Sequence, residues 1–146
     1  MIREAVSSDL DAVLALYLDL HEDSVPEDGE RLRSVWAQIL GDPNHHLLVN
    51  EQYGEIVASC VCVVVPNLTR GLRPYAFIEN VVTRADCRRR GYATQCLDRA
   101  REIARAAGCY KLMLLTGAKD AATLGFYHRA GFNSTDKTAF IQWLNQ

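Results

Sequence analysis

The chain has 146 residues, of which 49% are hydrophobic and 23% are charged, and its formal net charge is −2. These proportions fit a single globular domain over residues 1–146, because they supply both an apolar core and a hydrated surface. The longest apolar run, residues 56–65, contains Ser59 and ends at Pro66, about half the length of a membrane-spanning helix, and no signal-peptide segment follows Met1. We therefore expect neither membrane insertion nor secretion, and we predict a cytoplasmic protein.

The first half of the chain predicts a strand, two helices and a hairpin. Ser8 and Asp11 are typical of a helix N-terminus, and apolar residues follow at helical spacing as far as Leu20. Runs rich in β-forming residues on both sides of a turn at 53–54 predict paired strands. In chain order, the predicted elements are a strand over 2–6, a helix after Ser8, a helix over 30–40, and strands at 47–49 and 56–65.

The second half predicts a parallel crossover. A strand, a long amphipathic helix ending at Gly108 and a second strand form a right-handed βαβ unit if the two strands are neighbours. The predicted elements are a loop over 66–74, a strand over 75–83, the long helix, a buried strand over 110–115, a short helix over 121–130 and a closing strand over 138–144. The fold class is therefore α/β or α+β with a mixed sheet.

The cysteines, histidines and tryptophans are expected to have structural roles. The cysteines are odd in number and include no C-x-x-C pair, which argues against a disulfide framework or a zinc site. We expect reduced thiols and no metal. His45 and His46 begin a strand and are expected at an exposed edge, whereas Trp36 and Trp143 are expected in the core.

The charge is unevenly distributed along the chain. Residues 1–55 contain 12 acidic and 3 basic residues, whereas residues 56–146 contain 6 acidic and 13 basic residues. The basic second half indicates an anionic partner.

The segment Arg-Arg-Arg-Gly-Tyr-Ala, residues 88–93, lies between a predicted strand and the long helix. The free N–H groups and the positive dipole end of a helix N-terminus favour anions. Gly91 lets the backbone approach a phosphate closely, and arginine side chains supply donors suited to pyrophosphate. The spacing fits neither a G-x-G-x-x-G fingerprint nor a Walker loop.

This R-x-x-G-x-A segment resembles the pyrophosphate-binding motif of the GNAT acetyltransferase superfamily, whose members bind acetyl-coenzyme A. Downstream, Phe126-Tyr127 followed by Gly131-Phe132 is similar to the later F-Y-x-x-x-G-F motif of the family. Short fragments at 78–82 and 108–111 also resemble the glucosamine-6-phosphate acetyltransferases. The parts of the chain expected to bind the acceptor show no such match.

The resemblance implies a single GNAT-like domain with a mostly antiparallel sheet, helices on both faces and the parallel crossover at the cofactor site. It also implies that acetyl-CoA is bound by the backbone of a strand end and by the arginine loop. The residues concerned are Val81, Val82, Thr83, Arg88, Arg89, Arg90, Gly91, Tyr92, Ala93 and Thr94. Asp120 stands where the family often has Asn; it suits a helix cap better than a phosphate contact.

Acetyl transfer to an amine requires a base, because an alkyl amine with a pKa of about 10.4 is protonated at neutral pH. Glu79 is the only acidic residue in the strand before the arginine loop. We interpret it as the general base, acting directly or through a water. The structural alternative is a strand glutamate paired with an arginine or with solvent.

Tyr127 is the corresponding candidate for the general acid, a role that the resemblance assigns to this tyrosine. It would protonate the coenzyme A thiolate, which with a pKa of about 8.5 is already a reasonable leaving group. The alternative is an aromatic side chain packed on the inner face of a helix.

We therefore predict an acetyl-CoA-dependent N-acetyltransferase that acetylates a primary amine of a small molecule by direct attack in a ternary complex, without a metal. One alternative acceptor is a protein N-terminus or lysine, and one alternative function is a non-catalytic acyl-CoA sensor. A nucleic-acid-binding module is disfavoured by the slightly acidic chain and the absence of a binding motif. Pairing through the hairpin or the C-terminal strand would give a homodimer, as in many relatives.

Overall fold

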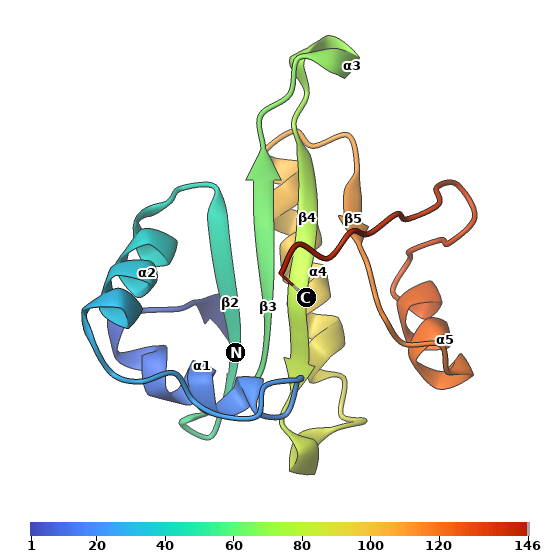
Figure 1. Cartoon of the computed structure of the whole chain (residues 1–146). Helices are drawn as coiled ribbons and strands as arrows, with labels where there is room; N and C mark the ends of the chain where they lie inside the picture. Colours follow the sequence, from blue (N-terminus) through green and yellow to red (C-terminus); the bar gives the residue numbers. More distant parts are fainter. Residues whose placement is uncertain (146) are drawn as a thin grey trace. The chain divides into compact units, whose positions relative to one another are not determined.

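The computed structural model describes residues 1–145, and the chain divides into two compact units, Met1–Leu114 and Leu115–Gln146. The first unit contains one sheet with neighbouring strands antiparallel except for the parallel pair β4 and β5 (Figure 1). In order across the sheet, its strands are β1 (Ile2–Glu4), β2 (His45–Gln52), β3 (Glu55–Val65), β4 (Tyr75–Thr83) and β5 (Leu112–Leu114). The single domain over 1–146 stays a prediction.

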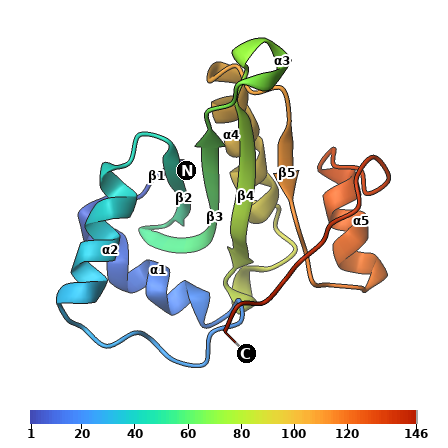
Figure 2. The same ribbon diagram turned by 45° about the horizontal axis from the view of Figure 1, so that its top comes forward.

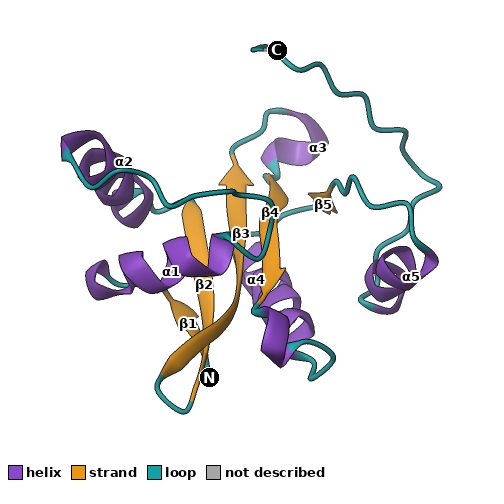
Figure 3. Ribbon diagram, turned by 60° about the horizontal axis from the view of Figure 1, so that its bottom comes forward, coloured by secondary structure: helices purple, strands orange, loops and turns teal. Residues whose placement is uncertain are grey.

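Helices cover both faces of this sheet (Figure 2, Figure 3). The alternation of side chains along β3 explains the two layers. Val61 belongs to a core cluster with Val13 and Trp36, whereas the thiols of Cys60 and Cys62 point the other way, toward backbone carbonyls of the long helix. The helices are α1 (Leu10–Tyr17) and α2 (Glu30–Gly41) on one face and α4 (Tyr92–Ala106) on the other. The predicted mixed fold class is confirmed.

The chain enters α1 through Asp9, not through the predicted cap Ser8. The carboxylate of Asp9 accepts hydrogen bonds from the Val6 N–H at 2.8 Å and from the Arg3 guanidinium at 2.7 and 3.1 Å. The charged Arg3 is also the main reason that the pKa of Asp9 lies below its usual value. A short 3₁₀ turn, Ser7–Asp9, precedes the helix. Asp9 therefore joins β1 to α1.

β4 contains one extra residue relative to β3. Ser59 pairs with Val82 and Val61 pairs with Glu79, so two steps along β3 match three along β4. Asn80 has a φ of 53° at this point, which marks a β-bulge. Adjacent residues of a regular strand point to opposite faces, but the bulge lets Glu79 and Asn80 line the same cavity.

Most of the other predicted elements are confirmed, with shifted boundaries. The predicted loop over 66–74 contains the short α3 (Thr69–Leu72), in which three consecutive residues have positive φ. A 3₁₀ turn, Ala85–Cys87, precedes the arginine loop. The strand predicted over 110–115 is reduced to β5 and is half-buried rather than buried.

The second unit contains α5 (Ala121–Arg129), as predicted, but the predicted closing strand is wrong. Residues 138–144 have no regular structure, and Trp143 is 68% exposed instead of lying in the core. The segment has β-forming residues, but a strand needs a hydrogen-bonded neighbour. Among residues 115–145, this unit holds no other strand to pair with.

Candidate active site

The N-terminus of α4 forms an open cradle of backbone N–H groups. Gly91 is the residue before the helix, with a φ of 80°, and no side chain of the described residues caps it. The first-turn N–H groups of Tyr92, Ala93 and Thr94 have no partner within the helix. The position where a Cβ would be added at Gly91 has no atom within 4 Å among the described residues. This open, left-handed glycine fits a group that approaches the backbone, such as a phosphate.

The charges around this cradle are positive. Arg89 and Arg90 are exposed, and neither forms an ion pair with another described residue. Arg88 is positioned by the carbonyls of Thr83 and Asp19, to which its guanidinium donates at 3.4 and 3.2 Å. All three arginines predicted for cofactor binding thus lie in the loop that leads into α4.

Asp86, the acidic residue of the 3₁₀ turn before the arginine loop, is neutralised by an arginine. The Arg84 Nε lies 2.6 Å from a carboxylate oxygen of Asp86, and this contact holds the pKa of Asp86 below its ordinary value. A second nitrogen of Arg84 contacts Glu55 at 3.1 Å. Because Arg84 neutralises Asp86, the arginine loop remains electropositive.

β4 continues toward this loop beyond the end of β5. β5 pairs only with Ala76, Phe77 and Ile78, so the rest of β4 has no strand on that side within the first unit. Val81, Val82 and Thr83 lie in this unpaired part, immediately before the 3₁₀ turn and the arginine loop. An extended ligand could add to this edge through backbone hydrogen bonds.

Glu79 lies on β4 at the wall of a cavity of about 410 Å³. The residues that line the cavity come mainly from α1, α2 and the sheet strands β2, β3 and β4. The Glu79 carboxylate is exposed, and no ion pair with an arginine involves it among residues 1–145. The alternative of an arginine-paired glutamate therefore receives no support, whereas the alternative of a solvent-contacting glutamate agrees with the exposed carboxylate.

The polar neighbour of Glu79 is Asn80, whose side-chain amide hydrogen-bonds the Tyr17 hydroxyl. Burial raises the pKa of Tyr17 and outweighs that hydrogen bond. The phenol therefore stays neutral at the pH of the reaction. Neither Tyr17 nor Asn80 was predicted as a site residue from the sequence. The polar Asn80 beside Glu79 in an otherwise apolar strand is nevertheless a detectable signal.

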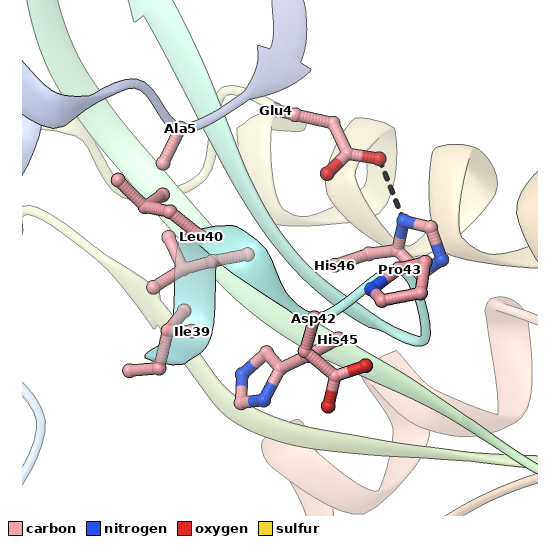
Figure 4. A pocket seen from close by; sticks show the side chains of 9 residues that line it. Glu4, Ala5, Ile39, Leu40, Asp42, Pro43, His45 and His46 are labelled. Atoms are coloured by element: carbon pink, nitrogen blue, oxygen red, sulfur yellow. Dashed lines mark hydrogen bonds and ion pairs between the residues drawn. The ribbon is translucent and has the colours of Figure 1, made fainter. Parts of the chain in front are cut away.

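His45 and His46 lie at the start of β2 and point in opposite directions (Figure 4). The His46 Nδ1 is 2.6 Å from the Glu4 carboxylate beside a second cavity of about 200 Å³. His45 lines both cavities, and its buried Nε2 has no hydrogen-bond partner among the described residues. Both histidines are half-buried, so the predicted exposed edge is wrong.

In the second unit, α5 carries Tyr127 between two aromatic rings. The ring centroids of Phe126 and Phe132 lie 5.0 and 6.4 Å from that of Tyr127, and the side chain is half-buried. Asp120 caps the helix, since its carboxylate accepts from the Thr123 N–H at 2.9 Å and from the Thr123 hydroxyl at 2.8 Å. These bonds lower the pKa of Asp120. The capping role predicted for Asp120 is present.

Residues 1–145 contain neither a metal-binding cluster of side chains nor a helix able to cross a membrane. In that range no three His, Cys, Asp or Glu side chains gather in a way that could hold a metal ion. None of its helices combines the length and the apolar character needed to cross a bilayer.

Known proteins resemble this chain in sequence and in fold. Residues 10–132 match the Acetyltransferase (GNAT) family. A provisionally named acetyltransferase from Agrobacterium tumefaciens str. C58 is 40% identical, with a TM-score of 0.92 over 99% of both chains. Aminoglycoside N(6')-acetyltransferase type 1 from Serratia marcescens is 28% identical over 91% of each chain. Glucosamine 6-phosphate N-acetyltransferase from Trypanosoma brucei brucei is 34% identical over 58% of this chain and 55% of that protein. The chain belongs to the GNAT family of acetyltransferases.

Proposed function

We propose that the protein transfers the acetyl group of acetyl-CoA to a primary amine of a small molecule, by direct attack in a ternary complex. The observation that carries this proposal is the placement of three features along one strand. β4 begins beside β5, carries Glu79 at the wall of a cavity and leads, through an end with no strand on the β5 side in the first unit, to the electropositive N-terminus of α4. A thioester carrier and an amine could therefore approach the same strand from two sides.

The arginine loop and the first turn of α4 bind the pyrophosphate of acetyl-CoA. The N–H groups of residues 91–94 provide a preorganised anion site, and Arg88, Arg89 and Arg90 add charge. The backbone of Val81, Val82 and Thr83 binds the pantetheine arm as an added strand. An N–H of this edge polarises the thioester carbonyl, which favours attack by the amine.

Glu79 removes the proton of the attacking amine, directly or through a water. Deprotonating an alkyl amine at pH 7 costs roughly 4–5 kcal/mol, so a nearby base is needed. General-base catalysis typically contributes about 10²- to 10⁴-fold in rate. The free, exposed carboxylate of Glu79 at the cavity wall suits this role.

Tyr127 protonates the departing thiolate of coenzyme A. A thiolate departs more easily than an alkylammonium group loses its proton at neutral pH. General-acid catalysis by Tyr127 therefore contributes less to the rate than general-base catalysis by Glu79. Replacing Tyr127 by Phe keeps the aromatic contacts with Phe126 and Phe132 and removes only the hydroxyl. The Tyr127→Phe variant should turn over more slowly and bind acetyl-CoA as before; equal turnover would contradict the role.

A small-molecule acceptor is favoured over a protein by two observations. The cavity beside Glu79, about 410 Å³, has the volume of a small-molecule site. The names of two relatives give an amino sugar phosphate and aminoglycosides as acceptors, and both are small amines. The peptide alternative requires a groove open enough to admit a chain.

The decisive experiment measures thiol release from acetyl-CoA with a panel of amines and peptides, together with calorimetric binding of acetyl-CoA. Amine-dependent thiol release with saturable acetyl-CoA binding supports the proposal. Binding without release for any acceptor would support the sensor alternative, and preference for peptides would support a protein acetyltransferase. Absence of acetyl-CoA binding would contradict all three.

We also propose a homodimer formed through residues 138–144. Phe140, Ile141, Trp143 and Leu144 are exposed by 91%, 66%, 68% and 83%, an apolar concentration that a monomer rarely leaves in water. A second copy would bury these side chains. The cytoplasmic location and the absence of a nucleic-acid partner stay predictions from composition.

A further inference from the structure

The cavity beside Glu79 is almost entirely apolar. Twelve of the fifteen residues that line it are aliphatic, aromatic or proline, and the other three are His45, Glu79 and Asn80. Tyr17 from α1 and Trp36 from α2 contribute aromatic surface, and Val61 and Val63 of β3 form part of the sheet wall. No lysine or arginine lines the cavity among the described residues.

Such walls select against a sugar. An amino sugar carries several hydroxyl groups, and each one buried without a partner weakens binding by roughly tenfold. A sugar phosphate additionally needs cationic donors, and no lysine or arginine of residues 1–145 lines this cavity. The acceptors named for the two curated relatives therefore do not match the walls of this site.

The charge near the cavity selects for a cation. Pro26 lines the cavity and lies in the segment 19–30, which contains six acidic residues and no lysine or arginine. The acidic residues are Asp19, Glu22, Asp23, Glu27, Asp28 and Glu30. This segment attracts a protonated amine and repels a phosphate.

The polar atoms of the cavity lie at separate places along the sheet. Glu79 pairs with Val61, which pairs with Leu47, whereas His45 pairs with Val63. His45 is thus two strands and two residues from Glu79, roughly 12 Å by strand geometry. His45 is the polar side chain at the end of the cavity remote from Glu79, and its buried Nε2 has no hydrogen-bond partner among the described residues.

We propose that the acceptor is an amine on an apolar body, aryl or branched alkyl, with at most one hydrogen-bonding group at its far end. The amine lies at Glu79, the body fills the space between α1, α2 and β3, and the remote group faces His45. This inference rests on the proposed acetyl transfer and specifies its acceptor.

The test compares kcat/KM for phenethylamine, tyramine, glucosamine 6-phosphate and kanamycin. The kcat/KM of the two aryl amines should exceed that of the two sugars by about 100-fold or more. Tyramine, which carries a hydroxyl at its far end, should have a higher kcat/KM than phenethylamine in the wild type and should lose this advantage in the His45→Leu variant. Val63→Phe fills the cavity and should raise the KM for aryl amines about tenfold or more with unchanged acetyl-CoA affinity. Val65→Phe is the matched control, since Val65 lies on the same strand outside the cavity lining. A sugar acceptor preferred over both aryl amines would overturn the proposal.

A binding measurement separates this proposal from the proposed function. Trp36 lines the cavity, so an acceptor there should change its fluorescence, measured in a Trp143→Phe background. If aryl amines change this fluorescence and no acetyl transfer occurs, the acceptor class holds and the transferase function fails. If transfer occurs but sugars, not aryl amines, change the fluorescence, the acceptor class fails and the function holds.

Discussion

At the scale of single residues, the chemistry depends on a carboxylate that the fold leaves unpaired. Arg3 and Arg84 each contact two acidic residues, whereas Glu79 forms no ion pair with any described residue. The bulge at Asn80 adds a polar neighbour on the same face. This combination of an apolar enclosure and one free carboxylate suits the removal of a proton from an amine.

Replacing Glu79 by Gln tests that role while preserving the shape of the side chain. The Glu79→Gln variant should lower kcat about 10²- to 10⁴-fold at pH 7 and leave the Kd for acetyl-CoA unchanged. Turnover by the variant should rise steeply with pH, because the acceptor then loses its proton in solution. Steady-state rates from pH 6 to 10 with calorimetric binding measure both effects. Wild-type turnover at neutral pH would remove Glu79 from the mechanism.

At the scale of elements, the two ends of α4 offer a matched comparison. Gly91 and Gly108 both have a φ of 80°, and an added Cβ meets no described atom within 4 Å at either position. Alanine at either site should cost about 1–2 kcal/mol of unfolding free energy, since a left-handed conformation is strained for it. Only Gly91→Ala places a methyl group in the anion cradle, so only this variant should weaken acetyl-CoA binding. Urea unfolding and calorimetry test this; equal binding by both variants would contradict the cradle.

The junction of β1 and α1 depends on Asp9, so its stability should depend on pH. The folded-state pKa of Asp9 is lowered, so its contribution is present above about pH 4, the unfolded value, and is lost as the pH falls through the folded value. Asp9→Asn should cost about 1–2 kcal/mol at pH 7 and progressively less below pH 4. Ser8→Ala should change the unfolding free energy by less than about 0.5 kcal/mol. Urea midpoints at pH 7 and pH 3 measure the difference, and a larger loss in Ser8→Ala would show that Ser8 is the cap.

These elements also show what the sequence could and could not reveal. Helix α4 and strand β4 follow from local periodicity, and the arginine loop follows from a short motif at their junction. The bulge at Asn80 and the Arg3–Asp9 pair depend on residues brought together by the sheet, which no local pattern encodes. The acceptor cavity was missed for the same reason, because its walls come from five separate elements. Glu79 was found because it is the one acidic residue of its strand and because the family resemblance supports its position.

At the scale of the whole molecule, the division of charge matches a division of roles. The basic residues at 84–90 lie at the proposed cofactor site, whereas the acidic segment 19–30 begins at Asp19 beside Arg88 and reaches the acceptor cavity at Pro26. An anionic carrier and a cationic acceptor would thus be attracted to different parts of the surface. The small net charge of −2 conceals this separation.

We expect the segment 138–144 to form its predicted strand only when it pairs with a second copy of the chain. Residues 115–145 of the second unit alone hold no such partner, which explains why no strand forms there. Its apolar, β-forming residues meet no strand within their own unit and remain exposed. Sedimentation should show a dimer that the double variant Ile141→Lys/Trp143→Asp converts to a monomer, with acetyl-CoA binding retained. Leu68→Asp, at an isolated apolar residue that is 86% exposed, should leave the dimer intact. In the dimer, Trp143 should emit at shorter wavelength than in dilute monomer, because pairing removes its indole ring from water. A wild-type protein that sediments as a monomer at all concentrations would contradict the pairing and leave the exposed segment without a partner.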